Sequence, residues 1–158
     1  MTLADVKRKI MDYVARRDHT EKELRQKLSI RFEKKLSDEA LLWAHQQNWL
    51  ASPEKLTEQM SEQLHRRKKG IRRINQKLQA LGLNQISSDT NIELKKAQEL
   101  IRAKWTAEDF IGLGYADAQK LKAKMMRFLM TRGFESHVIS QILKIEFNKG
   151  ASSYDEEF

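Results

Sequence analysis

Basic residues are the side chains in this sequence whose types and spacing suggest a function. Between Gln63 and Ser88 there are seven of them and no acidic residue: Arg66, Arg67, Lys68, Lys69, Arg72, Arg73 and Lys77. Uncompensated positive charges repel one another unless a polyanion is present, and release of the counterions of a nucleic acid then favours binding. The basic block therefore predicts contact with a nucleic acid or another anionic surface. The alternative is a solvated helix surface.

A second basic group lies nearer the carboxyl end. Lys120, Lys124 and Arg127 are four and three residues apart, which places them on one face of a helix. Arg132 follows, close to Gly133, where that helix is expected to end, and Lys122 lies off the face. We expect Lys120, Lys124 and Arg127, together with Arg132, to form a second anchor for the anion, again with a solvated surface as the alternative.

Aromatic residues do not accompany the basic block. No Phe, Tyr or Trp occurs between Gln63 and Ser88, so stacking of single-stranded bases is not predicted there. Trp43, Trp49 and Trp105 are expected to pack between helices. The predicted mode of binding is therefore contact with the nucleic-acid backbone, without readout of sequence.

No pattern in the sequence predicts catalysis. The absence of Cys excludes a thiolate nucleophile, a disulfide scaffold and a cysteine-ligated metal. Phosphate-binding loops, nucleophile elbows and zinc-binding helices have no counterpart in the chain. The four histidines lack the spacing of metal ligands: His19, His45, His65 and His137. We therefore predict a protein that is not an enzyme and that holds no metal and no cofactor.

Helices are predicted to position the basic residues. Apolar residues recur three and four positions apart almost throughout, and no strand-like alternation is sustained. The 158 residues include only one Pro and six Gly to interrupt helices. The sequence predicts helix caps at Thr2, Thr20, Ser37 and Ser52, and another helix that opens at Ser87-Ser88-Asp89. The fold is therefore expected to be all-α.

The predicted helices follow a degenerate threefold repeat. Three sets of residues occupy equivalent positions: Leu24, Ile74 and Ile139; Leu28, Leu78 and Leu143; and, at the cap, Thr20, Gly70 and Glu135. We predict an elongated array of three tandem three-helix repeats at residues 1–51, 52–105 and 106–150. An acidic, disordered tail is expected at 151–158.

The overall composition agrees with an anionic partner. The formal net charge is +8 and the pI is about 9.7. No apolar run approaches the roughly 18 residues that a membrane span needs, and the first residues lack a secretory pattern. We expect a cytoplasmic monomer that does not bind a membrane.

Several motifs resemble those of the bacterial RecX family. Residues 17–28, which begin Arg17-Asp18-His19, are similar to the first-repeat motif of that family. Residues 43–50 resemble the segment before its "GYLDD" stretch, residues 69–74 its "KGYGPxRI" motif, and residues 129–134 its "RGF" turn. The likeness covers residues 5–147. It departs at Lys68, Lys69 and Ile71, where the family usually has Gly, an aromatic residue and Pro, so this region is more basic than usual.

The resemblance implies a function that composition alone does not. RecX proteins are non-enzymatic modulators of the RecA recombinase in homologous recombination, DNA repair and the SOS response. They bind in the groove of the recombinase–DNA filament and limit filament growth, ATP hydrolysis, strand exchange and co-cleavage of the repressor. The implied partners are the RecA filament and, weakly and without sequence preference, single- and double-stranded DNA. The alternative is a stand-alone basic helical protein that binds nucleic acid.

Overall fold

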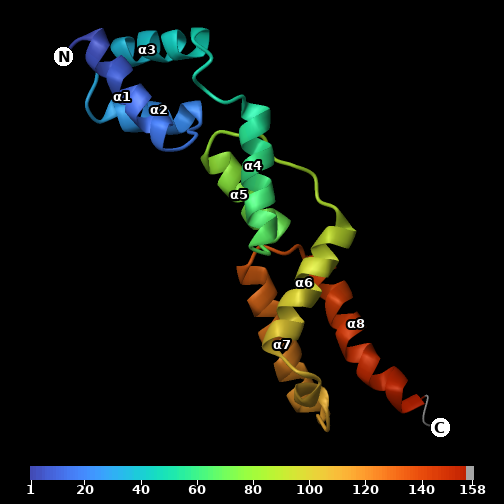
Figure 1. Ribbon diagram of the computed structural model, residues 1–158. Helices are drawn as coiled ribbons and strands as arrows, with labels where there is room; N and C mark the ends of the chain where they lie inside the picture. Colours follow the sequence, from blue (N-terminus) through green and yellow to red (C-terminus); the bar gives the residue numbers. More distant parts are fainter. Residues whose placement is uncertain (156–158) are drawn as a thin grey trace. The chain divides into compact units, whose positions relative to one another are not determined.

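The computed structural model describes residues 1–155, and side chains up to residue 148. This part of the chain contains eight α-helices, one short 3₁₀ helix and no strand, which confirms the predicted all-α class (Figure 1). The helices are α1 (Leu3–Arg16), α2 (Glu21–Ser29), α3 (Lys34–Gln46), α4 (Pro53–Arg66), α5 (Ile71–Ala80), α6 (Thr90–Lys104), η1 (Ala107–Phe110), α7 (Tyr115–Thr131) and α8 (Ser136–Asp155).

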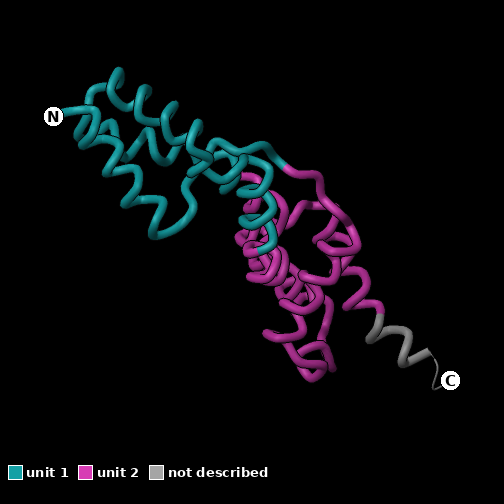
Figure 2. The backbone as a smooth tube through the Cα atoms, turned by 45° about the horizontal axis from the view of Figure 1, so that its top comes forward, with its two compact units in different colours: residues 1–62, 77–85 teal, residues 63–76, 86–158 magenta. Residues whose placement is uncertain are grey.

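The chain divides into two compact units (Figure 2). Unit 1 comprises residues 1–62 and 77–85, and unit 2 comprises residues 63–76 and 86–158. Helices α4 and α5 contribute residues to both units. The block of basic residues 66–73 therefore belongs to unit 2, whereas Lys77 belongs to unit 1.

The core of unit 1 is formed by α1, α2 and α3. Its buried side chains recur three or four residues apart along each helix, with Ala40 and Leu41 adjacent on α3: Val6, Ile10, Leu24, Leu28, Ala40, Leu41 and Ala44. Two capping boxes begin α1 and α2. The Thr2 and Thr20 hydroxyls accept hydrogen bonds from the N–H groups of Asp5 and Glu23, whose carboxylates accept from the cap N–H groups. These predicted caps are confirmed.

The predicted cap at Ser37 is wrong. Helix α3 begins at Lys34, with Glu33 in extended conformation as its N-cap. The additional turn places Leu36 one turn before Ala40, so Leu36 is partly buried against the core of unit 1. Ser37 lies inside the helix, buried, and its hydroxyl has no hydrogen-bond partner among the described residues.

The core of unit 2 joins α6, α7 and α8. Its members come from these helices and from the turn before α8: Ala97, Ile101, Met125, Leu129, Phe134, Val138, Ile139, Ile142 and Leu143. Helix α6, which the sequence analysis assigns to the second repeat, thus shares one core with the helices assigned to the third. The repeat boundaries and the elongated arrangement stay predictions. Helix α8 continues to Asp155, and residues 156–158 of the expected tail lie outside the described residues.

The repeat positions agree with the helix starts. The three residues given the shared cap position, Thr20, Gly70 and Glu135, immediately precede α2, α5 and α8. All six apolar residues aligned after them are buried. Each of the three aligned positions therefore precedes a helix whose aligned apolar residues are buried.

Candidate nucleic-acid interface

Two chain corners of unit 2 contact each other through their backbones. The N–H of Gly70, before α5, donates to the Arg132 carbonyl at 2.8 Å, and the N–H of Arg72 donates to the Gly133 carbonyl at 2.9 Å. A Cβ atom on Gly70 would lie 2.3 Å from the carbonyl carbon of Gly133. Only a residue without a side chain allows this approach, so Gly70 is what brings the first basic block beside Arg132.

Both helices that lead into these corners end in the same way. After α4, Lys68 has φ 58°, and the N–H of Lys69 donates to the Leu64 carbonyl at 3.0 Å. After α7, Gly133 has φ 94°, and the N–H of Phe134 donates to the Leu129 carbonyl at 3.2 Å. This left-handed closure reverses the chain within two residues. It brings the half-buried Lys69 and Arg132 to the two corners that contact each other.

A buried polar cluster fixes the first corner to α6. Lys96 and Glu93 are 7% and 1% exposed and form an ion pair. The Lys96 ammonium donates to the Lys69 carbonyl at 2.6 Å and to His65 Nδ1 at 2.9 Å, and the Glu93 carboxylate accepts from the N–H of Ile71 at 3.0 Å. Burial, with the nearby Lys96, lowers the pKa of His65 below its ordinary value, which keeps the ring neutral and able to accept.

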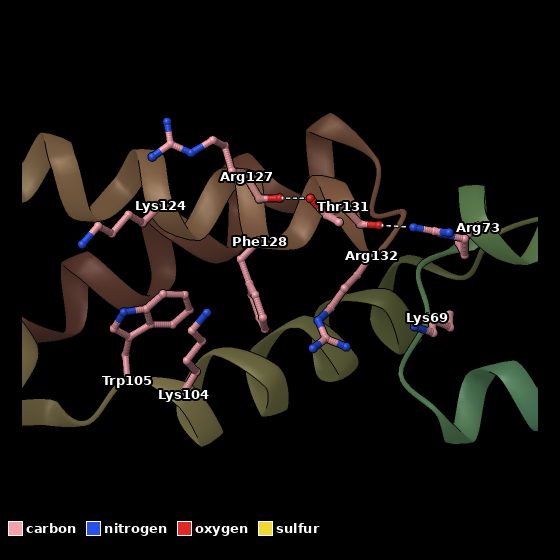
Figure 3. Close-up of a pocket in the computed structure, with 9 residues that line it drawn as sticks. All are labelled: Lys69, Arg73, Lys104, Trp105, Lys124, Arg127, Phe128, Thr131 and Arg132. Carbon is pink, nitrogen blue, oxygen red and sulfur yellow. Dashed lines mark hydrogen bonds between the residues drawn. The ribbon is translucent and has the colours of Figure 1, made fainter.

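The joined corners border an open groove of about 740 Å³ in unit 2 (Figure 3). Its walls come from the corner before α5, the carboxyl end of α6 and the last turns of α7. The lining residues are Lys69, Arg73, Lys104, Trp105, Lys124, Arg127, Phe128, Thr131 and Arg132. Six of these nine side chains are cationic and, among the described residues, no carboxylate lines the groove. The groove therefore favours a ligand with several negative charges.

The cations of the groove lack acidic partners. Within the described residues, none of the six forms an ion pair. Arg73 donates to the Thr131 carbonyl at 2.6 Å, a neutral acceptor that fixes its guanidinium at the groove wall. Lys124 and Arg127 are exposed on α7. An incoming anion would therefore not have to displace a carboxylate to reach them.

Two aromatic rings lie among these cations. Trp105 and Phe128 meet edge to face, with ring centroids 5.3 Å apart at 89°. The Lys104 ammonium lies 5.0 Å from the Trp105 ring centroid and 4.5 Å from that of Phe128, and the Arg132 guanidinium lies 4.6 Å from the Phe128 centroid. Figure 3 shows these side chains filling the space between α7 and the end of α6. The groove thus offers π-faces as well as positive charge.

The structure brings together five of the eleven residues singled out in the sequence. Lys69 and Arg73 of the first group and Lys124, Arg127 and Arg132 of the second line one groove. The other six lie outside it: Arg66, Arg67 and Arg72 are exposed, Lys68 is half-buried with its ammonium 3.5 Å from Glu99, Lys77 is exposed in unit 1, and Lys120 is exposed earlier on α7. Whether any of the eleven binds an anion stays a prediction.

Sequence reasoning missed Lys104, Trp105 and Phe128. Trp105 was expected only to pack between helices, and it does contact Phe128. Its position in a basic groove depends on the packing of α6 against the rest of unit 2. One signal in the sequence was available, because Lys104 and Trp105 are adjacent at the end of a predicted helix.

No group of three or more His, Asp or Glu side chains among the described residues is arranged to hold a metal ion. None of the described helices is long and apolar enough to cross a membrane.

Comparisons with known proteins agree with this structure. Residues 91–143 match a family model described as the third three-helix domain of RecX. A protein from Ralstonia nicotianae named regulatory protein RecX is 34% identical over 145 residues, which cover 88% of this chain and 86% of the relative. Its counterpart from Ralstonia pickettii is 33% identical and covers 87% and 86%.

Solved structures show the same fold. The crystal structure of RecX from Lactobacillus salivarius has a TM-score of 0.74 at 17% identity, over 92% of this chain and 96% of that one. A second crystal structure of regulatory protein RecX has a TM-score of 0.63 at 18% identity, over 89% and 70%. The resemblance of the sequence motifs is thus confirmed, and the chain belongs to the RecX family of regulatory proteins.

Proposed function

We propose that this protein regulates the RecA recombinase by binding the recombinase–DNA filament and limiting its extension, ATP hydrolysis, strand exchange and co-protease activity. Membership of the RecX family supports the regulatory role. The observation that carries the mechanism is the groove of unit 2, in which cations from two distant parts of the sequence meet without a neighbouring carboxylate. A nucleoprotein filament offers the phosphates that such a groove would bind.

The basic groove serves as an anchor in this proposal, and it catalyses no reaction. Lys124 and Arg127 reach the anion from α7, and Arg73 reaches it from α5. The exposed Arg66, Arg67 and Arg72 would add contacts beside the groove, to phosphates or to acidic recombinase loops. The protein acts as a cytoplasmic monomer without a cofactor.

The test measures ATP hydrolysis by the recombinase on single-stranded DNA. The protein should inhibit hydrolysis, and Lys124→Glu/Arg127→Glu should need at least about tenfold more protein for half-inhibition, since two favourable contacts become repulsive. The matched control is Lys95→Glu/Lys144→Glu, which makes the same charge change at exposed residues of unit 2 outside the groove. The proposal fails if the protein does not inhibit at any ratio.

A second candidate function uses the same groove without the recombinase. The aromatic rings beside the cations would suit a stand-alone nucleic-acid-binding protein. If about six phosphates were neutralised on bare duplex, the logarithm of the affinity would fall with the logarithm of salt at a slope of about −5. Tight binding with this slope, together with no effect on the recombinase, would favour the second candidate.

A further inference from the structure

The groove of unit 2 combines a row of cations with an aromatic edge. Lys124 and Arg132 are eight residues apart at the end of α7, which corresponds to about 12 Å along the helix. Arg73 lies at the Arg132 end and Trp105 at the Lys124 end in Figure 3. A single phosphate could not reach cations spread over this distance. The spacing therefore fits a chain of successive negative charges.

The aromatic edge distinguishes between kinds of nucleic acid. Trp105 is half-buried and lines the groove, with the Lys104 ammonium 5.0 Å from its ring centroid. In a duplex the faces of the bases are covered by their neighbours in the stack, whereas an unpaired base can stack on an aromatic ring. The Lys104 ammonium lies over the ring, and because Lys104 is exposed, a stacking base could displace the ammonium from the ring toward the phosphate of that base.

We propose that this groove binds a short stretch of single-stranded nucleic acid, with successive phosphates along Arg73, Arg132, Arg127 and Lys124 and one base stacked on Trp105. The inference deepens the proposed function, on which it rests for its biological setting, because it names the part of a recombinase filament that the groove would contact. An acidic protein segment is a different ligand. Its carboxylates would match the cations but would leave the aromatic edge without a planar partner.

The first test isolates the stacked base. The probe is a fluorescein-labelled oligothymidylate of about 20 nucleotides, compared with an abasic strand of equal length and charge. Trp105→Leu keeps an apolar side chain but removes the aromatic face. It should weaken binding of the oligothymidylate about tenfold and leave binding of the abasic strand unchanged. Equal effects on both strands, or no effect on either, would overturn the stacking.

A second measurement leaves Trp105 in place. In Trp43→Phe/Trp49→Phe, Trp105 is the only tryptophan of the chain. Its fluorescence should be quenched by the oligothymidylate and not by the abasic strand. Absence of this difference would overturn the proposal even if Trp105→Leu folded poorly.

The third test addresses the phosphates. Lys124→Gln/Arg127→Gln should reduce the salt slope for the oligothymidylate by about 1.4, since each lost phosphate contact on a single strand contributes about 0.7. Lys95→Gln/Lys144→Gln removes the same charge from unit 2 outside the groove and should leave the slope unchanged. Equal salt slopes for the two variants would overturn the proposal. So would a polyglutamate peptide that displaces the labelled oligothymidylate as well as unlabelled oligothymidylate does. No recombinase is present, so these results are independent of the ATPase test.

Discussion

Replacing Gly70 by Ala tests the contact between the two corners of unit 2. The φ angle of Gly70 lies outside the left-handed region that favours glycine, so the backbone conformation alone does not exclude Ala. The added Cβ, however, would lie 2.3 Å from the Gly133 carbonyl carbon and 2.4 Å from the N of Phe134. These are backbone atoms, and they cannot rotate away as a side chain would. The two corners would have to move apart.

The size of the effect follows from these contacts. Carbon atoms pack at about 3.5–4.0 Å, so the corners must separate by roughly 1 Å or more. This movement weakens the bonds from Gly70 N–H to Arg132 and from Arg72 N–H to Gly133, which together contribute about 1–3 kcal/mol. Overpacking in a close contact adds about 1–3 kcal/mol. We expect Gly70→Ala to lower the free energy of unfolding by about 2–6 kcal/mol.

The assay follows urea unfolding by tryptophan fluorescence. Trp43 and Trp49 lie in unit 1 and Trp105 lies in unit 2. In Trp43→Phe/Trp49→Phe, the fluorescence of Trp105 therefore reports on unit 2 alone. Adding Gly70→Ala to this background should move the transition of Trp105 to a lower urea concentration.

Gly114→Ala is the matched control. Gly114 also has negative φ, at −68°, but an added Cβ would meet no atom within 4 Å. Gly114→Ala should change the free energy of unfolding by no more than about 0.5 kcal/mol, because the reduced freedom of the unfolded chain offsets a poorer helix cap. If Gly70→Ala unfolds with the same free energy as Gly114→Ala, the two corners are not in contact and the reasoning is refuted.

Three further predictions concern the corner before α5, the buried pair of Glu93 and Lys96, and the histidines His19 and His65. Lys68→Gly should raise the free energy of unfolding by about 0.5–1 kcal/mol, because φ 58° is unfavourable for a residue with a Cβ; a lower urea midpoint would contradict this. Lys96→Met should lower the free energy of unfolding by about 3–5 kcal/mol, because Glu93 stays buried and unpaired. Adding Glu93→Gln should recover part of this loss in the same urea measurement. Burial lowers the pKa of His19 and His65, so the unfolded chain binds more protons and stability should fall as pH drops below about 6.5; a flat urea midpoint between pH 7.5 and 5.5 would disprove it.

The helices of this protein could be predicted because their signals are local. Thr20 and Glu23 are three residues apart, and both partners of the capping box are visible in the sequence. The equivalence of Thr20, Gly70 and Glu135 followed from apolar residues four positions apart. The cap predicted at Ser37 was wrong because the sequence marks the true start of α3 only weakly. Leu36 alone extends the apolar face by one turn before Ser37.

The groove could be predicted only in part, because it is made by tertiary packing. The charges of Arg73 and Arg127 were evident, but 54 positions separate them in the sequence. Their proximity depends on the approach of Gly70 to Gly133, and a glycine in a sequence does not indicate which backbone lies beside it. Trp105 could not be assigned to the groove because the same residue type packs in a core or lines a surface equally well.

The backbone groups that join the two corners are distinct from the side chains of Lys69 and Arg132, which line the groove. The atoms that join the corners are backbone atoms, and the group that fixes the first corner to α6 is the buried pair of Glu93 and Lys96. The side chains of Lys69 and Arg132 take no part in those bonds. A relative could therefore exchange Lys69 and Arg132, and so acquire a different ligand, while the backbone hydrogen bonds of the junction stayed the same. A change in the ligand of this groove would then need no change in the backbone that forms it.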